Sequence, residues 1–208
     1  MTSPEAQAAL PWPTVAAVAD VVTEDLGAGA DNRPSFYADP VAWLTTAAVT
    51  RALARCDRGT GPCPDVGVVV MSATCTAPTM AVIARTASRS RVSPLKFAGA
   101  NPGILAGLPC IRGQFHGPSL VLSTEPAVSV DTALCVAVHW LWTRQSRYAA
   151  CVAHTRPGGG HRVRCVVLGG PDGASRQGQE GQEDTAHVRR LLTETAGHAV
   201  RHTGQETP

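Results

Sequence analysis

The stretch from Gly117 to Leu134, GPSLVLSTEPAVSVDTAL, constrains the fold more than any other part of the chain. Its first half, PSLVLST, predicts a β-strand, and Val128 to Gln145 has apolar residues at helical intervals. The two patterns lie so close together that they predict a sharp turn from a strand into a long helix. Unpaired backbone N–H groups at the start of such a helix favour a thiolate or an oxyanion. Pro126 stands at this turn, and proline offers no nucleophile, no acid and no N–H donor.

Length and composition favour one packed, mixed α/β domain. The 208 residues suffice for a buried core, and 44% of them are hydrophobic while 16% are charged. The formal net charge is only +2 and the arginines are scattered, so nucleic acid is not an expected partner. No apolar run approaches the ~20 residues that a membrane-spanning helix requires. We therefore expect no membrane partner.

The cysteines give no sign of a metal site or of a disulfide framework. There are seven of them, an odd number, and the N-terminal MTSPEAQAALPWPT lacks the pattern of a secretory signal. This predicts a cytoplasmic location. Cys56 and Cys63 form one close pair, but no second Cys or His pair follows at zinc spacing. Small buried residues or surface thiols are the simpler interpretation, and we expect no metal and no cofactor.

Residues 35–170 predict one domain of helices and strands. Asp39 and Pro40 begin a helix over PVAWLTTAAVTRALARC, and VGVVVMSAT predicts a central strand that is covered on both faces. TMAVIARTASRS predicts a short helix. The Gly, Pro and Asn residues of VSPLKFAGANPGILAGLPCIRGQFHG predict a structured loop segment without a long regular element. YAACVAHT and HRVRCVVLGG, joined by RPGGG, predict a hairpin.

The two ends of the chain have weaker patterns. Residues 1–34 form a partly irregular segment, in which Val15 to Val22 fits either a short helix or an edge strand. Residues 171–208 predict a polar linker, PDGASRQGQEGQED, followed by a possible C-terminal helix in TAHVRRLLTETAGHAV.

The motifs within residues 35–170 resemble the N-terminal half of the β-ketoacyl synthases, in the thiolase-like superfamily. The resemblance rests on SPLKF followed by ANPG, on GPSLVLST, and on the spacing from Pro126 to Asp131 and Leu134. PAVSVDTAL aligns without a gap on the Cys-Ala-Ala-Gly-Leu-Asp-Ala-Leu-like elbow of ketosynthases, which places Pro126 on the nucleophilic cysteine. The resemblance implies a thiolase-like half-fold: a mixed β-sheet with helices packed on it, in one domain.

The same resemblance implies a truncated ketosynthase that does not condense acyl chains. Ordinary ketosynthases bring two histidines from a C-terminal half, and that half has no counterpart in this resemblance. It further implies an acyl-pocket loop at Phe97, Asn101 and Pro102. A dimer strand, which ketosynthases pair across a two-fold axis, is implied at Ser119, Leu120, Val121, Leu122 and Ser123.

Glu125 and His116 flank the elbow and are the remaining acid/base candidates. A structural role is the simpler interpretation of each: a carboxylate near helix N–H groups or an arginine, and a histidine with satisfied hydrogen bonds. If Glu125 were surrounded by apolar groups, it could transfer protons to an enol or polyene thioester.

Three functional hypotheses follow. The first is a non-catalytic ketosynthase-like accessory subunit of bacterial polyketide or fatty-acid-type biosynthesis, similar in logic to a chain length factor. It would bind a ketosynthase or homologous subunit, or an acyl carrier protein, in a homo- or heterodimer. The alternative is a cysteine-independent isomerase, dehydratase or cyclase that acts on a carrier-bound acyl or polyene chain through Glu125 or His116. The third is a purely structural fragment.

Overall fold

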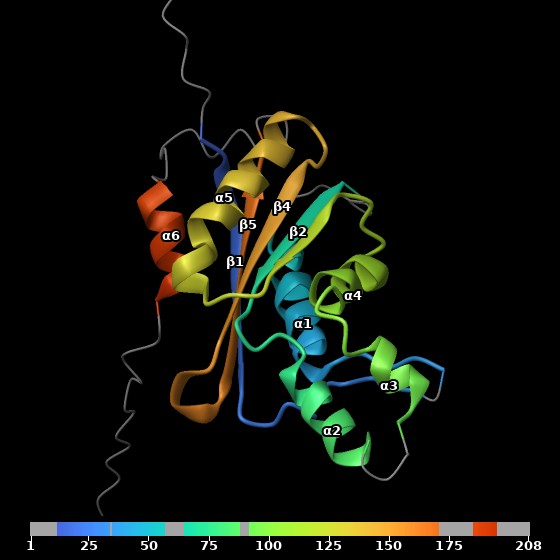
Figure 1. The fold of residues 1–208 in the computed structure, drawn as a ribbon. Helices are drawn as coiled ribbons and strands as arrows, with labels where there is room; N and C mark the ends of the chain where they lie inside the picture. The colour runs from blue at the N-terminus through green and yellow to red at the C-terminus, as the bar shows by residue number, and fades with distance from the viewer. Residues whose placement is uncertain (1–11, 34, 57–64, 88–91, 171–184, 195–208) are drawn as a thin grey trace, which may run out of the picture.

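A computed structural model describes residues 12–33, 35–56, 65–87, 92–170 and 185–194 of the chain. The predicted polar linker over 171–184 lies outside these residues, as does Cys63. Within them, a five-stranded sheet forms the centre of one domain (Figure 1).

The sheet is mixed, as the sequence predicts. Its spatial order is β1-β5-β4-β2-β3. β3 and β4 run parallel to β2, while β5 is antiparallel to both β4 and β1. The strands are β1 (Thr14–Thr23), β2 (Val66–Met71), β3 (Ser119–Leu122), β4 (Tyr148–Thr155) and β5 (His161–Gly169).

Helices cover both faces of this sheet. In Figure 1, α1 and α4 lie against one face, and α5 and α6 lie against the other. The helices are α1 (Pro40–Ala54), α2 (Ala77–Ala87), α3 (Pro94–Ala98), α4 (Ile104–Gly113), α5 (Pro126–Trp142) and α6 (Thr185–Thr193), with a short 3-10 turn at Pro157–Gly159. No helix among the described residues is both long enough and apolar enough to span a membrane.

β2 has apolar neighbours on both faces, which confirms the interpretation of its β-branched run. Val68 and Val70 pack in the core layer below α1, whereas Val69 and Met71 pack in the layer below α5. All six residues of the strand are buried. A strand buried on both faces has no solvent face for polar residues, so its sequence is continuously apolar.

α1 begins where the sequence predicts. Oδ1 of Asp39 accepts a hydrogen bond of 2.8 Å from the N–H of Val41, and Pro40 is the first helical residue. Oδ2 of the same carboxylate accepts from the N–H of Thr79, which ties α1 to α2.

Two segments differ from, or go beyond, the sequence-based expectation. Val15 to Val22 is an edge strand, because β1 pairs with β5 along its length. The segment expected to lack a long regular element contains α3 and the ten-residue α4, with Pro109 inside it. That expectation was wrong: Leu105 and Leu108 of α4 are fully buried against the core, and this burial offsets the helix-breaking effect of Pro109.

The predicted strand, sharp turn and helix at residues 117–134 are confirmed. β3 ends at Leu122 and α5 begins at Pro126, earlier than the helical pattern suggests, because proline suits the first turn of a helix. Gly117 precedes β3 at a close approach to β2. A Cβ there would overlap with the carbonyl oxygen of Val66, so the backbone path requires glycine.

The predicted C-terminal helix is present as α6, and its docking is now defined. Val188 and Leu192 are buried in the layer that α5 also covers. Arg189 pairs with Asp131 of α5, and the guanidinium of Arg164 in β5 donates to the carbonyl of Leu191 over 2.7 Å. Residues 195–200 of the predicted helix lie outside the described part of the chain.

Candidate functional site

The elbow between β3 and α5 has no nucleophile at the first helical position, which is Pro126. Glu125 is the N-cap residue, and its carbonyl accepts from the N–H groups of Val128 and Ser129 at 2.9 and 3.1 Å. Pro126 is buried and has no N–H to donate. The side chain of Glu125 is exposed and forms no capping hydrogen bond. Glu125 therefore lacks the buried, apolar surroundings that an acid/base role would require.

The structure does not bring the two acid/base candidates together. His116 precedes β3 and is exposed, whereas Glu125 follows the same strand. β3 is four residues long, and a strand rises about 3.3 Å per residue, so the two side chains belong to opposite ends of the sheet.

The residues of the expected acyl-pocket loop lie around α3. Phe97 belongs to α3 and is 66% exposed. Asn101 and Pro102 are exposed between α3 and α4, where Oδ1 of Asn101 accepts a hydrogen bond of 2.8 Å from the N–H of Gly103. None of the three lines either of the two cavities considered below.

The expected dimer strand is the outermost strand of the sheet. Among the described residues, β3 pairs with β2 alone. Val68 and Ser72 donate their N–H groups to the carbonyls of Pro118 and Leu122, at 2.9 and 3.0 Å. Successive residues of a strand direct their backbone groups to opposite sides. The N–H and C=O of Val121 therefore point to the open edge.

A buried polar network lies where β2 and β4 end. Ser72 follows β2, and its Oγ is 2.8 Å from Nδ1 of His154 in β4. The register explains this pairing, because Met71 lies opposite Ala153 and the next residues along each strand are Ser72 and His154. Nε2 of His154 is 2.9 Å from Nδ1 of His161, at the start of β5, and the two ring planes are nearly parallel, with 5° between them. All three side chains are buried.

Cys75 extends this network toward the elbow. Its N–H donates to Oγ of Ser72 over 2.9 Å, and its Sγ lies 3.4 Å from Oγ of Ser123, just after β3. The backbone of Cys75 has a φ of 40°, which is uncommon for a residue with a side chain. The network therefore crosses the carboxyl ends of all three parallel strands, the edge where ligands bind in open α/β sheets.

Burial keeps both histidines neutral near pH 7. It lowers the pKa of His154 to about 4, with smaller contributions from the charges of His161 and Arg156. The pKa of His161 is also lowered, first by burial and then by Arg156, while Asp39 acts in the opposite direction. Burial raises the pKa of Asp39 despite the hydrogen bonds that it accepts.

A cavity of about 290 Å³ opens beside His161. Its polar groups are the Thr74 hydroxyl, the Arg156 guanidinium and the His161 ring, and its remaining lining is Leu26, Ala77, Pro78 and Ala81. Arg156 is exposed and forms no ion pair with any described residue. The cavity thus combines three polar groups with a small apolar surface.

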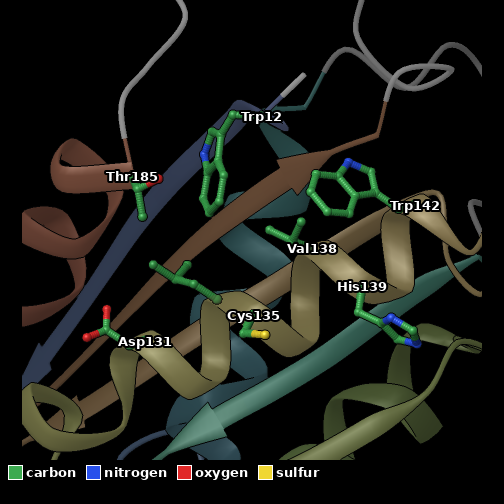
Figure 2. A pocket seen from close by; sticks show the side chains of 8 residues that line it. Trp12, Asp131, Cys135, Val138, His139, Trp142 and Thr185 are labelled. Atoms are coloured by element: carbon green, nitrogen blue, oxygen red, sulfur yellow. The ribbon is translucent and has the colours of Figure 1, made fainter. Parts of the chain in front are cut away.

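A second cavity, of about 390 Å³, lies beside α5 and is also lined by Trp12 and by Thr185, the first residue of α6 (Figure 2). Figure 2 shows Trp12 and Trp142 at one end of it and Asp131 at the other. Leu134, Cys135, Val138, His139 and Thr185 complete the lining. Nε1 of Trp12 is buried without a hydrogen-bond partner among the described residues. Within the described parts of the chain, no cluster of three or more Cys, His, Asp or Glu residues could hold a metal ion.

The sequence-based candidates did not include the histidine pair. His154 lies near the end of the predicted strand YAACVAHT, and His161 begins the predicted strand HRVRCVVLGG. One signal was available: two apolar strands, VGVVVM and YAACVA, are each followed directly by a polar side chain, Ser72 and His154. Only the parallel pairing and register of β2 and β4 show that these side chains meet.

Solved structures with this fold are ketosynthases and their partners. The ishigamide ketosynthase/chain length factor has a TM-score of 0.64 and 13% sequence identity, over 79% of this chain and 64% of that one. A ketosynthase in complex with its chain length factor from Xenorhabdus doucetiae has a TM-score of 0.55 and 11% identity, over 76% and 79%. A type II polyketide acyl carrier protein complex with its hexaketide-bound ketosynthase has a TM-score of 0.61 and 12% identity, over 78% and 64%.

These similarities establish a ketosynthase-like, thiolase-type fold in a single α/β domain. The chain spans 64% of the length of the ishigamide protein, so it corresponds to part of that molecule. No family model and no curated sequence matches the chain.

Proposed function

We propose that this ketosynthase-like protein is a non-catalytic accessory subunit of polyketide or fatty-acid-type biosynthesis, which binds a ketosynthase partner or an acyl carrier protein. The observation that carries the proposal is the open edge of β3, which leads directly into an elbow whose first helical residue is Pro126. The edge offers backbone hydrogen bonds to a partner strand, while Pro126 offers no group for acyl transfer.

The apolar residues of β3 support the proposal that another chain covers this edge of the sheet. Leu120, Val121 and Leu122 are half-buried, and among the described residues the outer edge of their strand has no backbone partner. An apolar edge strand without protection promotes aggregation, and pairing with another chain removes that hazard. One of the similar solved structures is a ketosynthase with its chain length factor, and another is a ketosynthase with an acyl carrier protein, which makes these the first partners to test.

Co-expression with a ketosynthase and an acyl carrier protein tests the proposal, with native mass spectrometry as the readout. Val121→Pro removes the outward N–H while the hydrogen bonds of β3 to β2 stay in place. Val121→Ala is the matched control, because it shortens the same side chain and keeps the N–H. We expect Val121→Pro to weaken a ketosynthase complex by tenfold or more, and Val121→Ala to weaken it by less.

Three outcomes are informative. A ketosynthase complex that depends on the Val121 N–H supports pairing through β3. A complex with the acyl carrier protein alone, unaffected by Val121→Pro, supports carrier binding at another surface. The absence of both complexes contradicts the accessory-subunit proposal.

A second candidate function is the cysteine-independent isomerase, dehydratase or cyclase, and one observation favours it. The Glu125 carboxylate lies beside the N-terminus of α5, is exposed and forms no capping hydrogen bond, so a carrier-bound chain can reach it. Turnover of a carrier-bound polyene that is lost in Glu125→Gln but retained in His116→Gln would establish this function. Turnover that survives both substitutions would exclude these two residues as the acid/base group.

A further inference from the structure

The hydrogen bonds of His154 favour one tautomer of His161. Ser72 Oγ accepts from the N–H of Cys75, which leaves its own proton for Nδ1 of His154 at 2.8 Å, and the Thr74 hydroxyl lies 3.4 Å from the same nitrogen. A His154 ring that accepts at Nδ1 carries its proton at Nε2 and donates it to Nδ1 of His161. His161 then carries its proton at Nε2. Among the described residues this Nε2 has no partner, and His161 lines the cavity beside β5.

We infer that the cavity beside His161 binds the anionic group, a carboxylate or a phosphate, of a small molecule, with the Nε2–H of His161 and the guanidinium of Arg156 as the donors. His154 and Ser72 act as positioning residues, because they hold His161 in the donating tautomer. This inference does not depend on the accessory-subunit proposal.

The charges around the cavity support an anion over a cation. Arg156 is the one charged side chain among the residues that line the cavity, and no described carboxylate neutralises it. Asp39 interacts with His161 electrostatically, but its two oxygens accept from the N–H groups of Val41 and Thr79, and it does not line the cavity. Glu24, near Gly160, does not line it either. Hydrogen bonds between cationic donors and oxyanions are among the stronger ones in proteins.

The volume of the cavity and its apolar lining residues limit how large and how polar the rest of the ligand can be. Ligand pockets commonly measure about 300–1,000 Å³, so this cavity of about 290 Å³ suits a small molecule or one end of a longer one. Leu26, Ala77 and Ala81 give it an apolar wall. A short aliphatic carboxylate matches both features, and inorganic phosphate tests the anionic group without an apolar part.

Nuclear magnetic resonance of the histidine ring nitrogens in the full-length chain tests the inference. We expect the signals of His161 to report the Nε2–H tautomer. Butyrate or inorganic phosphate should then shift the His161 Nε2 signal saturably, whereas potassium chloride at equal ionic strength should not. A response to butyrate alone identifies a carboxylate site, and a response to phosphate alone identifies a phosphate site.

Variants with matched controls distinguish a loss of anion binding from a general change in structure. Arg156→Gln changes an exposed side chain and should weaken binding by about tenfold or more, while His139→Gln, on α5, should leave it unchanged. Ser72→Ala should convert the His161 signals to a mixture of tautomers and weaken binding as well, a readout that a merely structural role would not move. Equal shifts with chloride, a His161 ring without a proton on Nε2, or unchanged binding in Arg156→Gln would each overturn the inference.

Discussion

Two neighbouring regions at the carboxyl ends of the parallel strands are built in opposite ways. After β3, the elbow has an exposed Glu125 and a buried Pro126 that cannot donate a hydrogen bond. At the ends of β2 and β4, the buried side chains of Ser72 and His154 form a hydrogen bond with each other. His154 forms a second hydrogen bond with His161. The resemblance to ketosynthases places the nucleophile at the elbow. Here the fixed polar groups lie beside it, and we propose that the elbow is part of a docking surface.

The largest expected difference between the two regions is in stability. His154→Ala leaves Ser72 Oγ and His161 Nδ1 without their partner and opens a void in the core. We expect the free energy of unfolding to fall by about 2–4 kcal/mol, from lost hydrogen bonds and cavity formation. Glu125→Ala changes an exposed side chain and should lower it by about 0.5 kcal/mol or less. Urea unfolding curves measure both.

An exposed histidine provides the control for this comparison. His139→Ala removes an imidazole from the surface of α5 and should behave like Glu125→Ala. If His154→Ala were as mild as His139→Ala, the buried network would not be a stabilising part of the fold.

Acid should destabilise the protein through the histidine network. The pKa of His154 falls from about 6.5 to about 4 on folding, so the unfolded state binds more protons between these values. The stability present above pH 6.5 is therefore lost as the pH falls toward 4, by on the order of 3 kcal/mol. His161 acts in the same direction, and Asp39, whose pKa is raised, acts in the opposite one.

Urea midpoints between pH 7.5 and 4.5 measure this effect in the wild type and in His154→Gln. The variant should have a flatter dependence on pH, because it removes the main titrating group. An equally steep loss of stability in the variant would assign the acid sensitivity to other residues.

The reactivity of the cysteine thiols should differ between exposed and buried positions, a smaller effect than the changes in stability above. Cys75, whose Sγ is 3.4 Å from Oγ of Ser123 just after β3, lies near the elbow and is 6% exposed. Burial raises the pKa of Cys151 to about 12 and that of Cys165 well above its usual value. We expect iodoacetamide to label the exposed Cys135 in the native state, and Cys75, Cys151 and Cys165 only after unfolding. Preferential labelling of native Cys75 would show that a reactive thiol has replaced the one absent from the elbow.

Local signals explain what the sequence could predict. The continuous apolar run of β2, the Asp39–Pro40 start of α1 and the glycine-rich turn between β4 and β5 each act within a few residues. The change from strand to helix at the elbow is equally local. These features do not depend on which strands become neighbours.

Features that depend on long-range packing were not predictable in the same way. α4 forms through a glycine- and proline-rich sequence because Leu105 and Leu108 reach the core, and composition alone favours a loop. Ser72 and His154 are 82 residues apart in the sequence, and they meet only because β2 and β4 pair in parallel with this register. Single residues such as His161 look like ordinary turn residues until the hairpin places them.

The central claim, that the elbow serves docking and not covalent chemistry, has one direct test. The chain is incubated with an acyl-loaded carrier protein and a ketosynthase, and its intact mass is measured under denaturing conditions. We expect an unchanged mass for this chain, even where native conditions show a complex. A stoichiometric acyl adduct on this polypeptide would contradict it.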